Sequence, residues 1–274
     1  MKVYPLYQVD VFTKEYYGGN PAAVCVLDEE IEEELMKKIS AEMNLSETAF
    51  LLPLDKKKEV YSLRWFTPQV EVDICGHGTI GTSKVIYDIM NAKSEKLSFK
   101  TKSGDLIARK CEDGIGIDMP LDEPLTFEPT IELLKALGLN GYKTARIGAK
   151  TGKVIIEVSD EAIIHNLKPN FEQLKDLKFK ENVKGVAVTT NNCDDYDFVS
   201  RYFNPWAGIN EDPVTGSVHT VLATYWGELL DKKEMKAFQA SYRGGELILK
   251  VMDNNRLELI GDAVITLKGE IYSK

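Results

Sequence analysis

The sequence predicts an α+β fold of two similar lobes, each a barrel-like β-sheet around one buried helix. Segments 78–90 and 214–230 are predicted to be helices, and both are almost free of charge. No formally charged side chain lies between Ile74 and Ser83, and His219 is the one acidic or basic residue between Val214 and Gly227. A helix that is apolar on nearly all sides is a buried helix. Short strand-like runs flank both segments, which indicates a sheet around each helix.

The two halves of the chain also resemble each other. The segment RWFTP at 64–68 returns as RYFNP at 201–205. Eleven or twelve residues after its arginine, each copy leads into a Gly-rich helix start, CGHGT at 75–79 and PVTGS at 213–217. The period is far too long for a solenoid repeat and indicates duplication of a whole half. We therefore expect two lobes related by a pseudo-two-fold axis, with the two helix starts facing a cleft where a small molecule binds.

The first lobe is expected to span residues 1–118. Its predicted amphipathic helix, 30–44, carries Leu35, Met36, Ile39 and Met43 on one face. Its predicted strands are 4–12, 22–27, 47–52 and 59–66.

The second lobe is expected to span residues 119–262, because three prolines make 119–129 the best boundary in the chain. We expect the C-terminal strand, 263–274, to join the first lobe. The predicted helices are 131–137 and 170–177, and the predicted strands are 154–158, 185–189, 196–203, 234–240, 247–251 and 257–259.

Composition and charge exclude several classes of function. The 34 Lys and Arg against 43 Asp and Glu give a formal net charge of −9, which disfavours nucleic acid as a partner. The lysines at 56–58 are expected to form a solvated loop. No run of about 18 apolar residues predicts a membrane helix. The beginning of the chain shows no targeting signal, so a cytoplasmic location is expected.

The cysteines give no pattern for a disulfide framework or a metal site. Cys25, Cys75, Cys111 and Cys193 are scattered, and only Cys75 has a histidine, His77, nearby. We therefore expect neither a metal nor another cofactor.

The two predicted helix starts are suited to binding an anion. The first turn of a helix presents unpaired N–H groups and the positive end of the helix dipole, and glycine lets a ligand approach the backbone. Two such ends at one cleft would bind an anion, most simply a carboxylate. The same field would stabilise an enolate-like transition state.

Five segments together resemble the PhzF-like (phenazine-biosynthesis) family, which shares the diaminopimelate epimerase fold. The matching motifs cover nearly the full chain. They are VDVF at 9–12 with GNPAAV at 19–24, NLSETAF at 44–50, RWFTP at 64–68 through CGHGT at 75–79, EDPVTGS at 211–217 and, more loosely, Gln239 with RGG at 243–245.

The resemblance implies an enzyme without a cofactor that acts on a small carboxylate. It implies that Glu47, in the Ser-Glu-Thr motif, moves the proton, and that His77 and Asp212 line the same cleft. It also makes a homodimer plausible. The expected substrate-binding residues are Asn20, Cys75, Gly76, Gly78, Thr79, Gly216 and Ser217.

The residues at the two helix starts decide which proton chemistry is expected. Racemases and epimerases of this fold use two cysteines, one from each equivalent position. Here Cys75 holds the first position, and we place Pro213, beside Asp212, at the second. A two-thiol reaction is therefore disfavoured. A single carboxyl group, Glu47, suits an isomerase that removes a proton from one carbon of an unsaturated or amino acid and returns it to another.

Several alternatives stay open at this point. The chain could be an epimerase or racemase that uses Cys75 with a non-thiol partner, or a non-catalytic binding protein. Glu47 could close a capping box with Asn44, and Asp212 could cap the second buried helix. Cys75 could be a small apolar contact and His77 a structural histidine. We expect His219 in the core, and His165 in a structural or surface position.

Overall fold

A computed structural model describes residues 1–55 and 59–273, so the lysine cluster at 56–58 lies outside the described residues. The chain forms two compact units. The first unit comprises Met1–Asp118 and Leu259–Lys274, and the second unit comprises Met119–Glu258. The chain thus returns to the first unit at Leu259, earlier than the Ala263 used for the predicted boundary.

The first unit is built on a sheet with the strand order β18, β1, β2, β3, β4, β6, β7, β8. Neighbouring strands run antiparallel, except for the parallel pairs β2–β3 and β4–β6. The strands are β1 (Lys2–Val11), β2 (Asn20–Val26), β3 (Thr48–Asp55), β4 (Val60–Phe66), β6 (Lys96–Thr101), β7 (Gly104–Cys111), β8 (Gly114–Pro120) and β18 (Ala263–Ser273). The short strand β5 (Glu71–Val72) pairs with the end of β4.

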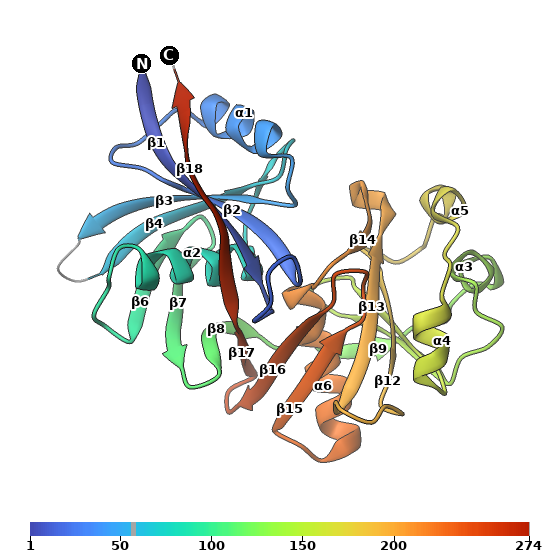
Figure 1. Cartoon of the computed structure of the whole chain (residues 1–274). Coiled ribbons are helices and arrows are strands. Elements are labelled where there is room, and N and C mark those ends of the chain that lie inside the picture. The colour runs from blue at the N-terminus through green and yellow to red at the C-terminus, as the bar shows by residue number, and fades with distance from the viewer. Residues whose placement is uncertain (56–58, 274) are drawn as a thin grey trace. The chain divides into compact units, whose positions relative to one another are not determined.

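Two helices cover the two faces of this sheet (Figure 1). Helix α2 (Gly76–Asp88) packs against β1, β2, β3, β7 and β18, and its residues from His77 to Ser83 are all buried. Helix α1 (Glu33–Met43) lies on the opposite face, where Met36 and Ile39 join Phe50 and Phe66 in a separate apolar cluster. The sheet therefore wraps around α2, as the uncharged sequence of that helix predicts.

The second unit repeats this arrangement. Its sheet has the order β9, β10, β11, β12, β13, β15, β16, with parallel pairs β11–β12 and β13–β15 in the same places as in the first unit. The strands are β9 (Pro124–Thr126), β10 (Thr144–Gly148), β11 (Val154–Glu157), β12 (Val186–Thr190), β13 (Phe198–Asn204), β15 (Glu234–Gln239) and β16 (Gly245–Met252). The short strand β14 (Ile209–Asp212) pairs with β13 as β5 pairs with β4. Strand β17 (Arg256–Gly261) crosses the boundary between the units.

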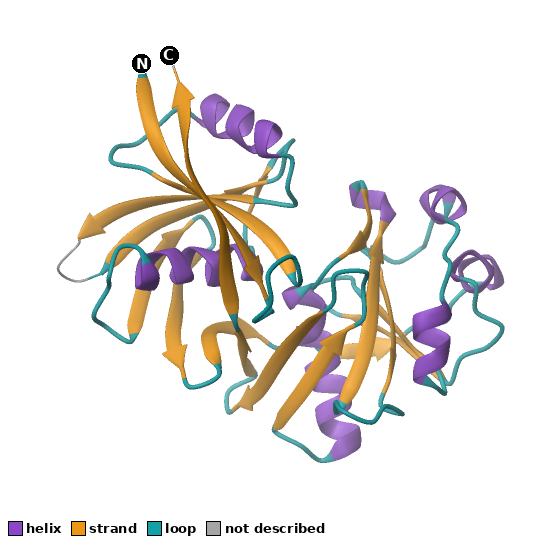
Figure 2. Ribbon diagram, in the orientation of Figure 1, coloured by secondary structure: helices purple, strands orange, loops and turns teal. Residues whose placement is uncertain are grey.

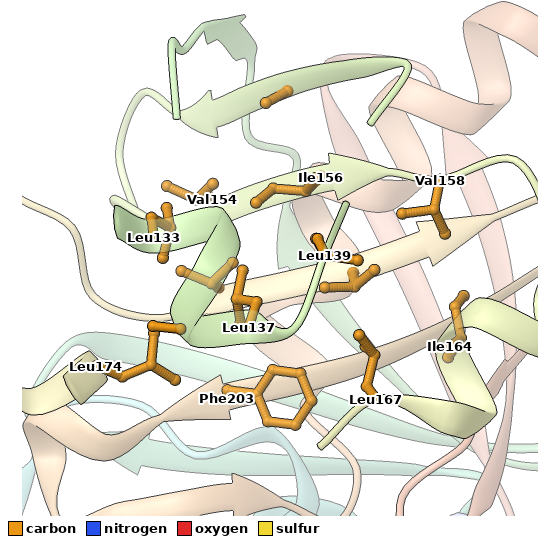
Figure 3. Packing of buried hydrophobic residues seen from close by; sticks show 14 of the residues in the cluster. Leu133, Leu137, Leu139, Val154, Ile156, Val158, Ile164, Leu167, Leu174 and Phe203 are labelled. Atoms are coloured by element: carbon orange, nitrogen blue, oxygen red, sulfur yellow. The ribbon is translucent and has the colours of Figure 1, made fainter. Parts of the chain in front are cut away.

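Helix α6 (Gly216–Leu230) is the counterpart of α2 and contacts β9, β15 and β16. Three short helices cover the opposite face of the sheet (Figure 2): α3 (Ile131–Leu137), α4 (Glu161–Asn166) and α5 (Phe171–Asp176). Their side chains Leu137, Ile164 and Leu174 pack with Phe203 of β13 in a fully apolar cluster (Figure 3). A 3-10 turn, η1 (Pro205–Ala207), joins β13 to β14.

The sequence-based assignments hold for both buried helices, which begin at Gly76 and Gly216. Strands β6 to β10 include several that were not predicted. In KLSFKT and GDLIARKC apolar residues alternate with polar ones, which is the pattern of a half-buried strand, so these two strands could have been predicted from the sequence. Among the residues that the structure describes, no helix is long and apolar enough to cross a membrane.

His219 of α6 is fully buried, as expected, while His165 lies on the exposed side of α4. The Nδ1 atom of His219 lies 2.7 Å from the carbonyl oxygen of Thr215, and its ring stacks on Phe198 with 6.0 Å between centroids. Burial lowers the pKa of His219 to about 4. The imidazole is therefore neutral at physiological pH, and Nδ1 carries the proton because a carbonyl oxygen can only accept.

We predict that His219 makes the stability of the fold depend on pH. Its pKa is lower in the folded state than the ordinary 6.5, so the unfolded chain binds the proton first as the pH falls. The stability that neutral His219 contributes above pH 6.5 is lost between 6.5 and 4, at about 1.4 kcal/mol per pH unit and on the order of 3 kcal/mol in all. Urea unfolding across this pH range should show a shallower loss of stability in His219→Gln than in the wild type. Equal slopes for the two proteins would show that this reasoning is wrong.

Candidate active site

The two units can be compared residue by residue through their strand registers. Phe66 pairs with Thr48 on one side and Glu71 on the other. Phe203 pairs in the same way with Val186 and Glu211. Phe203 is therefore the counterpart of Phe66, and every neighbouring residue can be assigned a counterpart by counting along the strands.

An arginine–glutamate pair is repeated at these positions. Arg64 binds Glu71 through Nε at 2.7 Å and through the terminal nitrogen at 3.0 Å. Arg201 binds Glu211 in the same bidentate way, at 2.7 and 2.9 Å. Each guanidinium group also lies 5.1 Å from the ring centroid of the phenylalanine two residues later. The duplication seen in RWFTP and RYFNP thus preserves a side-chain arrangement as well as a backbone.

The helix starts lie at equivalent places beyond these pairs. Cys75 is the N-cap of α2 and Thr215 is the N-cap of α6, both with extended backbones at φ −141° and −114°. Serine hydroxyls fix the two loops alike, because Ser103 Oγ and Ser241 Oγ each donate to a carbonyl oxygen two residues before the N-cap, both at 2.7 Å.

The counterpart of Cys75 is therefore Thr215, and the placement of Pro213 at that position is wrong. The sequence comparison matched glycines, but the loop before α6 is longer because it contains the turn η1. Counting from the strand pairs also places Asp212 opposite Tyr202, where the first unit has Val72 opposite Trp65.

The first unit brings together Glu47, His77 and Cys75. His77 Nε2 lies 3.2 Å from Glu47 Oε2, and His77 Nδ1 lies 3.7 Å from Cys75 Sγ. The backbone N–H of Gly78 donates to the same sulfur at 3.3 Å. The side chain of His77 is 9% exposed and that of Glu47 is 17% exposed, so the cluster is largely removed from water.

The local structure explains how Glu47 reaches this position. Asn44 ends α1 in a left-handed conformation, at φ 50°, and Thr48 begins β3, so Glu47 does not cap a helix start. The carbonyl oxygen of Glu47 accepts from the N–H of Ala23 at 3.2 Å, which fixes the entry into β3. Asn20, which is fully buried, begins the parallel neighbour β2 at the same end of the strand pair.

The contacts of the cluster suit the transfer of a proton better than the binding of a metal ion. The ligand atoms of Glu47, Cys75 and His77 lie within 4.8 Å of one another. However, the imidazole presents one ring nitrogen to the carboxylate and the other to the thiol. An ion bound to Nε2 beside Glu47 would lie on the far side of the ring from Cys75, whereas a proton can pass through the ring.

Two of the expected substrate-binding positions on α2 have partners inside the unit. Thr79 donates its N–H and its hydroxyl to the carbonyl oxygen of Cys75, at 3.1 and 2.7 Å. A Cβ at Gly78 would lie 2.9 Å from both Cys75 Sγ and Trp65 Cδ1, so this glycine allows α2 to pack closely. Gly76 begins α2.

The second unit places Asp212, Gly216 and Ser217 around the start of α6. Asp212 ends β14 and accepts a hydrogen bond from the hydroxyl of Thr215. Gly216 is buried, and Ser217 is half-buried at the position that His77 holds in the first unit. The N-cap of α6 is Thr215, so the alternative in which Asp212 caps the second buried helix is wrong.

Glu47 has no carboxylate counterpart in the second unit. Thr48 corresponds to Val186, and Val154 N–H donates to Gly185 O at 2.9 Å just as Ala23 N–H donates to Glu47 O. The counterpart of Glu47 is therefore Gly185. Its φ is +124°, and a Cβ there would lie 2.0 Å from Tyr202 Oη. The duplicated scaffold thus carries a carboxylate at this position in the first unit and a glycine in the second.

Comparison with known proteins places the chain in a family. The profile described as phenazine biosynthesis-like protein (PhzC-PhzF) matches residues 9–269. The chain belongs to this family. It is 41% identical to the human phenazine biosynthesis-like domain-containing protein, over 97% of this chain and 98% of the relative. It is also 41% identical to an uncharacterized isomerase of Halalkalibacterium halodurans, over 99% of both chains.

Solved structures of this family have the same fold. A phenazine biosynthesis protein of the PhzF family from Enterococcus faecalis superposes with a TM-score of 0.92 at 39% identity, covering 99% of this chain and 100% of that chain. A predicted epimerase from Pseudomonas aeruginosa has a TM-score of 0.76 at 18% identity, with coverage of 99% and 100%. The second match shows that the epimerase-like fold is shared.

Several residues of these clusters were missed by the sequence analysis. Thr215 and Trp65 lay inside quoted motifs but had no assigned role. No local pattern marks Gly185, because the need for glycine at this position comes from its contact with Tyr202, 17 residues later in the chain. Once the strand pairs are known, counting along them identifies Thr215 as the counterpart of Cys75 and Gly185 as the counterpart of Glu47.

We predict that Gly185 and Gly104 respond differently to alanine. Both have positive φ, +124° and +105°, but a Cβ at Gly104 meets no atom within 4 Å. Gly104→Ala should therefore cost only backbone strain, roughly 1–3 kcal/mol. Gly185→Ala should cost about 1–3 kcal/mol more, because Tyr202 is held in place and must move. Thermal and urea unfolding would measure the difference, and equal losses would mean that Tyr202 does not occupy this space.

Proposed function

We propose that this protein is a cofactor-independent isomerase that moves a proton on a small unsaturated or amino carboxylic acid. Glu47 is the general acid/base. The observation that carries the proposal is the pair formed by Glu47 Oε2 and His77 Nε2, 3.2 Å apart and largely buried. Family membership and the uncharacterized isomerases among the relatives support the reaction class.

The first step is the removal of a proton from a carbon of the bound acid. Glu47 takes the proton as a carboxylate, and the electron pair left on carbon is delocalised into the conjugated acid as an enolate-like species. Glu47 then returns the proton to a second carbon on the same face. Atoms and charge balance without any other reactant, because the proton that leaves is the proton that returns.

His77 supports both steps through the same contact. The 3.2 Å contact of Nε2 is proposed to attract one carboxylate oxygen of Glu47, and this leaves the other oxygen for the substrate carbon. Asp212, Gly216 and Ser217 are proposed to orient the substrate.

An epimerase that uses Cys75 is the second candidate, because His77 Nδ1 lies 3.7 Å from the thiol and can take its proton. The residue at the equivalent helix start is Thr215, whose hydroxyl donates to Asp212. An alcohol is far less acidic than a thiol, so Thr215 cannot replace the second cysteine of a two-thiol racemase. Solvent deuterium that appears at a stereocentre, and is lost in Cys75→Ala, would favour this second function.

We predict that Glu47→Gln abolishes proton transfer without unfolding the protein. The test incubates wild type and variant with a panel of small unsaturated and amino carboxylic acids in heavy water and follows isomerisation and deuterium uptake by proton NMR. For any acid that the wild type converts, Glu47→Gln should be slower by roughly 100-fold or more, because general acid–base catalysis contributes this much.

The matched control is Glu42→Gln on the exposed side of α1, which should keep wild-type rates. Circular dichroism and the unfolding midpoint show whether both variants are folded. Wild-type turnover in a folded Glu47→Gln would contradict the role of Glu47 and with it the proposed function.

A further inference from the structure

We propose that Thr215 and Gln239 are positioning residues that hold the carboxylate of Asp212 in one orientation and in its ionised form. This inference rests on the proposed function, in which Asp212 orients the substrate. It adds two residues to the site, neither of which is among the expected catalytic or substrate-binding residues.

The hydroxyl of Thr215 is the direct contact. Thr215 Oγ1 donates to Asp212 Oδ2 in a short hydrogen bond. Thr215 is 6% exposed, so this bond is shielded from competing water. A hydrogen bond to an ionised oxygen is stronger than one between neutral groups, so the contact favours the carboxylate form of Asp212.

Gln239 determines the direction of that hydroxyl. Its side chain is fully buried at the end of β15. Its Oε1 accepts from the N–H of Thr215 at 2.9 Å, which turns its Nε2 toward Asp212 O at 2.7 Å and Thr215 Oγ1 at 3.4 Å. Because Nε2 donates to the hydroxyl oxygen, the hydroxyl proton points away from Gln239 and toward Asp212.

His219 holds Thr215 at a third atom. Its protonated Nδ1 donates to the carbonyl oxygen of Thr215 at 2.7 Å. The N–H, the carbonyl and the hydroxyl of Thr215 therefore all have fixed partners. A residue held at three atoms can keep a neighbouring carboxylate in one place.

The first unit shows that the fold does not need this network. Counting from the paired strands, the counterparts of Asp212, Thr215 and Gln239 are Val72, Cys75 and Thr101. The hydroxyl of Thr101 donates to its own hairpin, to Gly104 O at 2.7 Å. The serine contacts and the arginine–glutamate pairs are present in both units, yet the contacts on the carboxylate exist in the second unit alone. If the fold itself required these contacts, we would expect them in both units.

The other ionisable groups around Asp212 are already fixed. Glu211 is bound by Arg201, and His219 is neutral. Tyr202 lies opposite Asp212 in the strand pair, and burial, together with the charge of Asp212, raises its pKa well above the ordinary range. The ammonium group of Lys153 lies on Tyr202, 4.4 Å from its ring centroid. Tyr202 and Lys153 keep their charge throughout the acidic range in which a carboxyl group titrates. His219, whose pKa is about 4, changes its charge in that range, so its protonation is followed alongside that of Asp212.

The experiment measures the ionisation of Asp212 directly and needs no substrate. The full chain is labelled with carbon-13 at the aspartate carboxyl carbons, and the Asp212 signal is assigned from its absence in Asp212→Asn. Thr215→Val keeps the shape of the side chain and removes the donor. The midpoint of the Asp212 titration should rise by roughly one pH unit, a tenfold change in the ionisation equilibrium. Thr215→Ser keeps the hydroxyl and should titrate like the wild type.

Thr101→Val is the matched control at the position that corresponds to Gln239 in the first unit, and it should leave the midpoint unchanged. If Thr215→Val does not fold, Thr215→Cys takes its place, because cysteine is the natural residue at the equivalent helix start and its thiol is a weak donor. A wild-type midpoint in a folded Thr215→Val or Thr215→Cys would overturn the proposal. Such a result would leave the role of Glu47 untouched, and a failure of Glu47→Gln to slow turnover would leave the titration result standing.

Discussion

The geometry of both candidate clusters depends on the contact between an arginine and a glutamate at the end of a central strand. Arg64 holds Glu71 and Arg201 holds Glu211 through two hydrogen bonds each. The pair ties two short antiparallel strands together, and the N-cap residue of the buried helix follows four residues after the glutamate in both units. A bidentate pair fixes distance and angle together, which a single hydrogen bond does not. Its main contribution is therefore to place the N-cap residue, more than to add stability.

A duplicated scaffold with equal backbones can carry unequal chemistry. The positions that matter are few: Glu47 against Gly185, Cys75 against Thr215, and Val72 against Asp212. In the first unit a carboxylate, an imidazole and a thiol are in contact. In the second unit the first of these positions cannot hold a side chain, because Tyr202 fills the space. The asymmetry is therefore built into the packing and is not limited to the residues at the surface of the site.

The sequence predicts the large features of this fold because they arise from local patterns. The uncharged runs of α2 and α6 identify two buried helices, and the repeated RWFTP and RYFNP segments identify the duplication. Family motifs then point to Glu47, for which the local pattern alone favours a helix cap with Asn44. The structure places Asn44 at the end of α1 instead.

The remaining features depend on contacts between residues far apart in the chain, which local patterns do not contain. The counterpart of Cys75 is misplaced by two residues when glycines are matched, because the turn η1 lengthens one loop and not the other. Gln239 bonds to Thr215 across 24 positions, and nothing in the sequence around either residue connects them. The match of Gln239 to a family motif indicates that the residue is of interest but does not say which group it touches.

The substitution of threonine for the second cysteine has a consequence for the reaction. A racemase needs a base on each face of the reacting carbon, and a thiol can act as one because it loses its proton near neutral pH. Thr215 cannot lose its proton there, and its hydroxyl is already directed at Asp212. A hydroxyl with that partner can only hold the carboxylate. The proposed function therefore assigns Asp212, at the start of the second unit, to orienting the substrate, and it assigns proton transfer to Glu47. An allylic shift, in which the proton returns to the side from which it came, needs no second base.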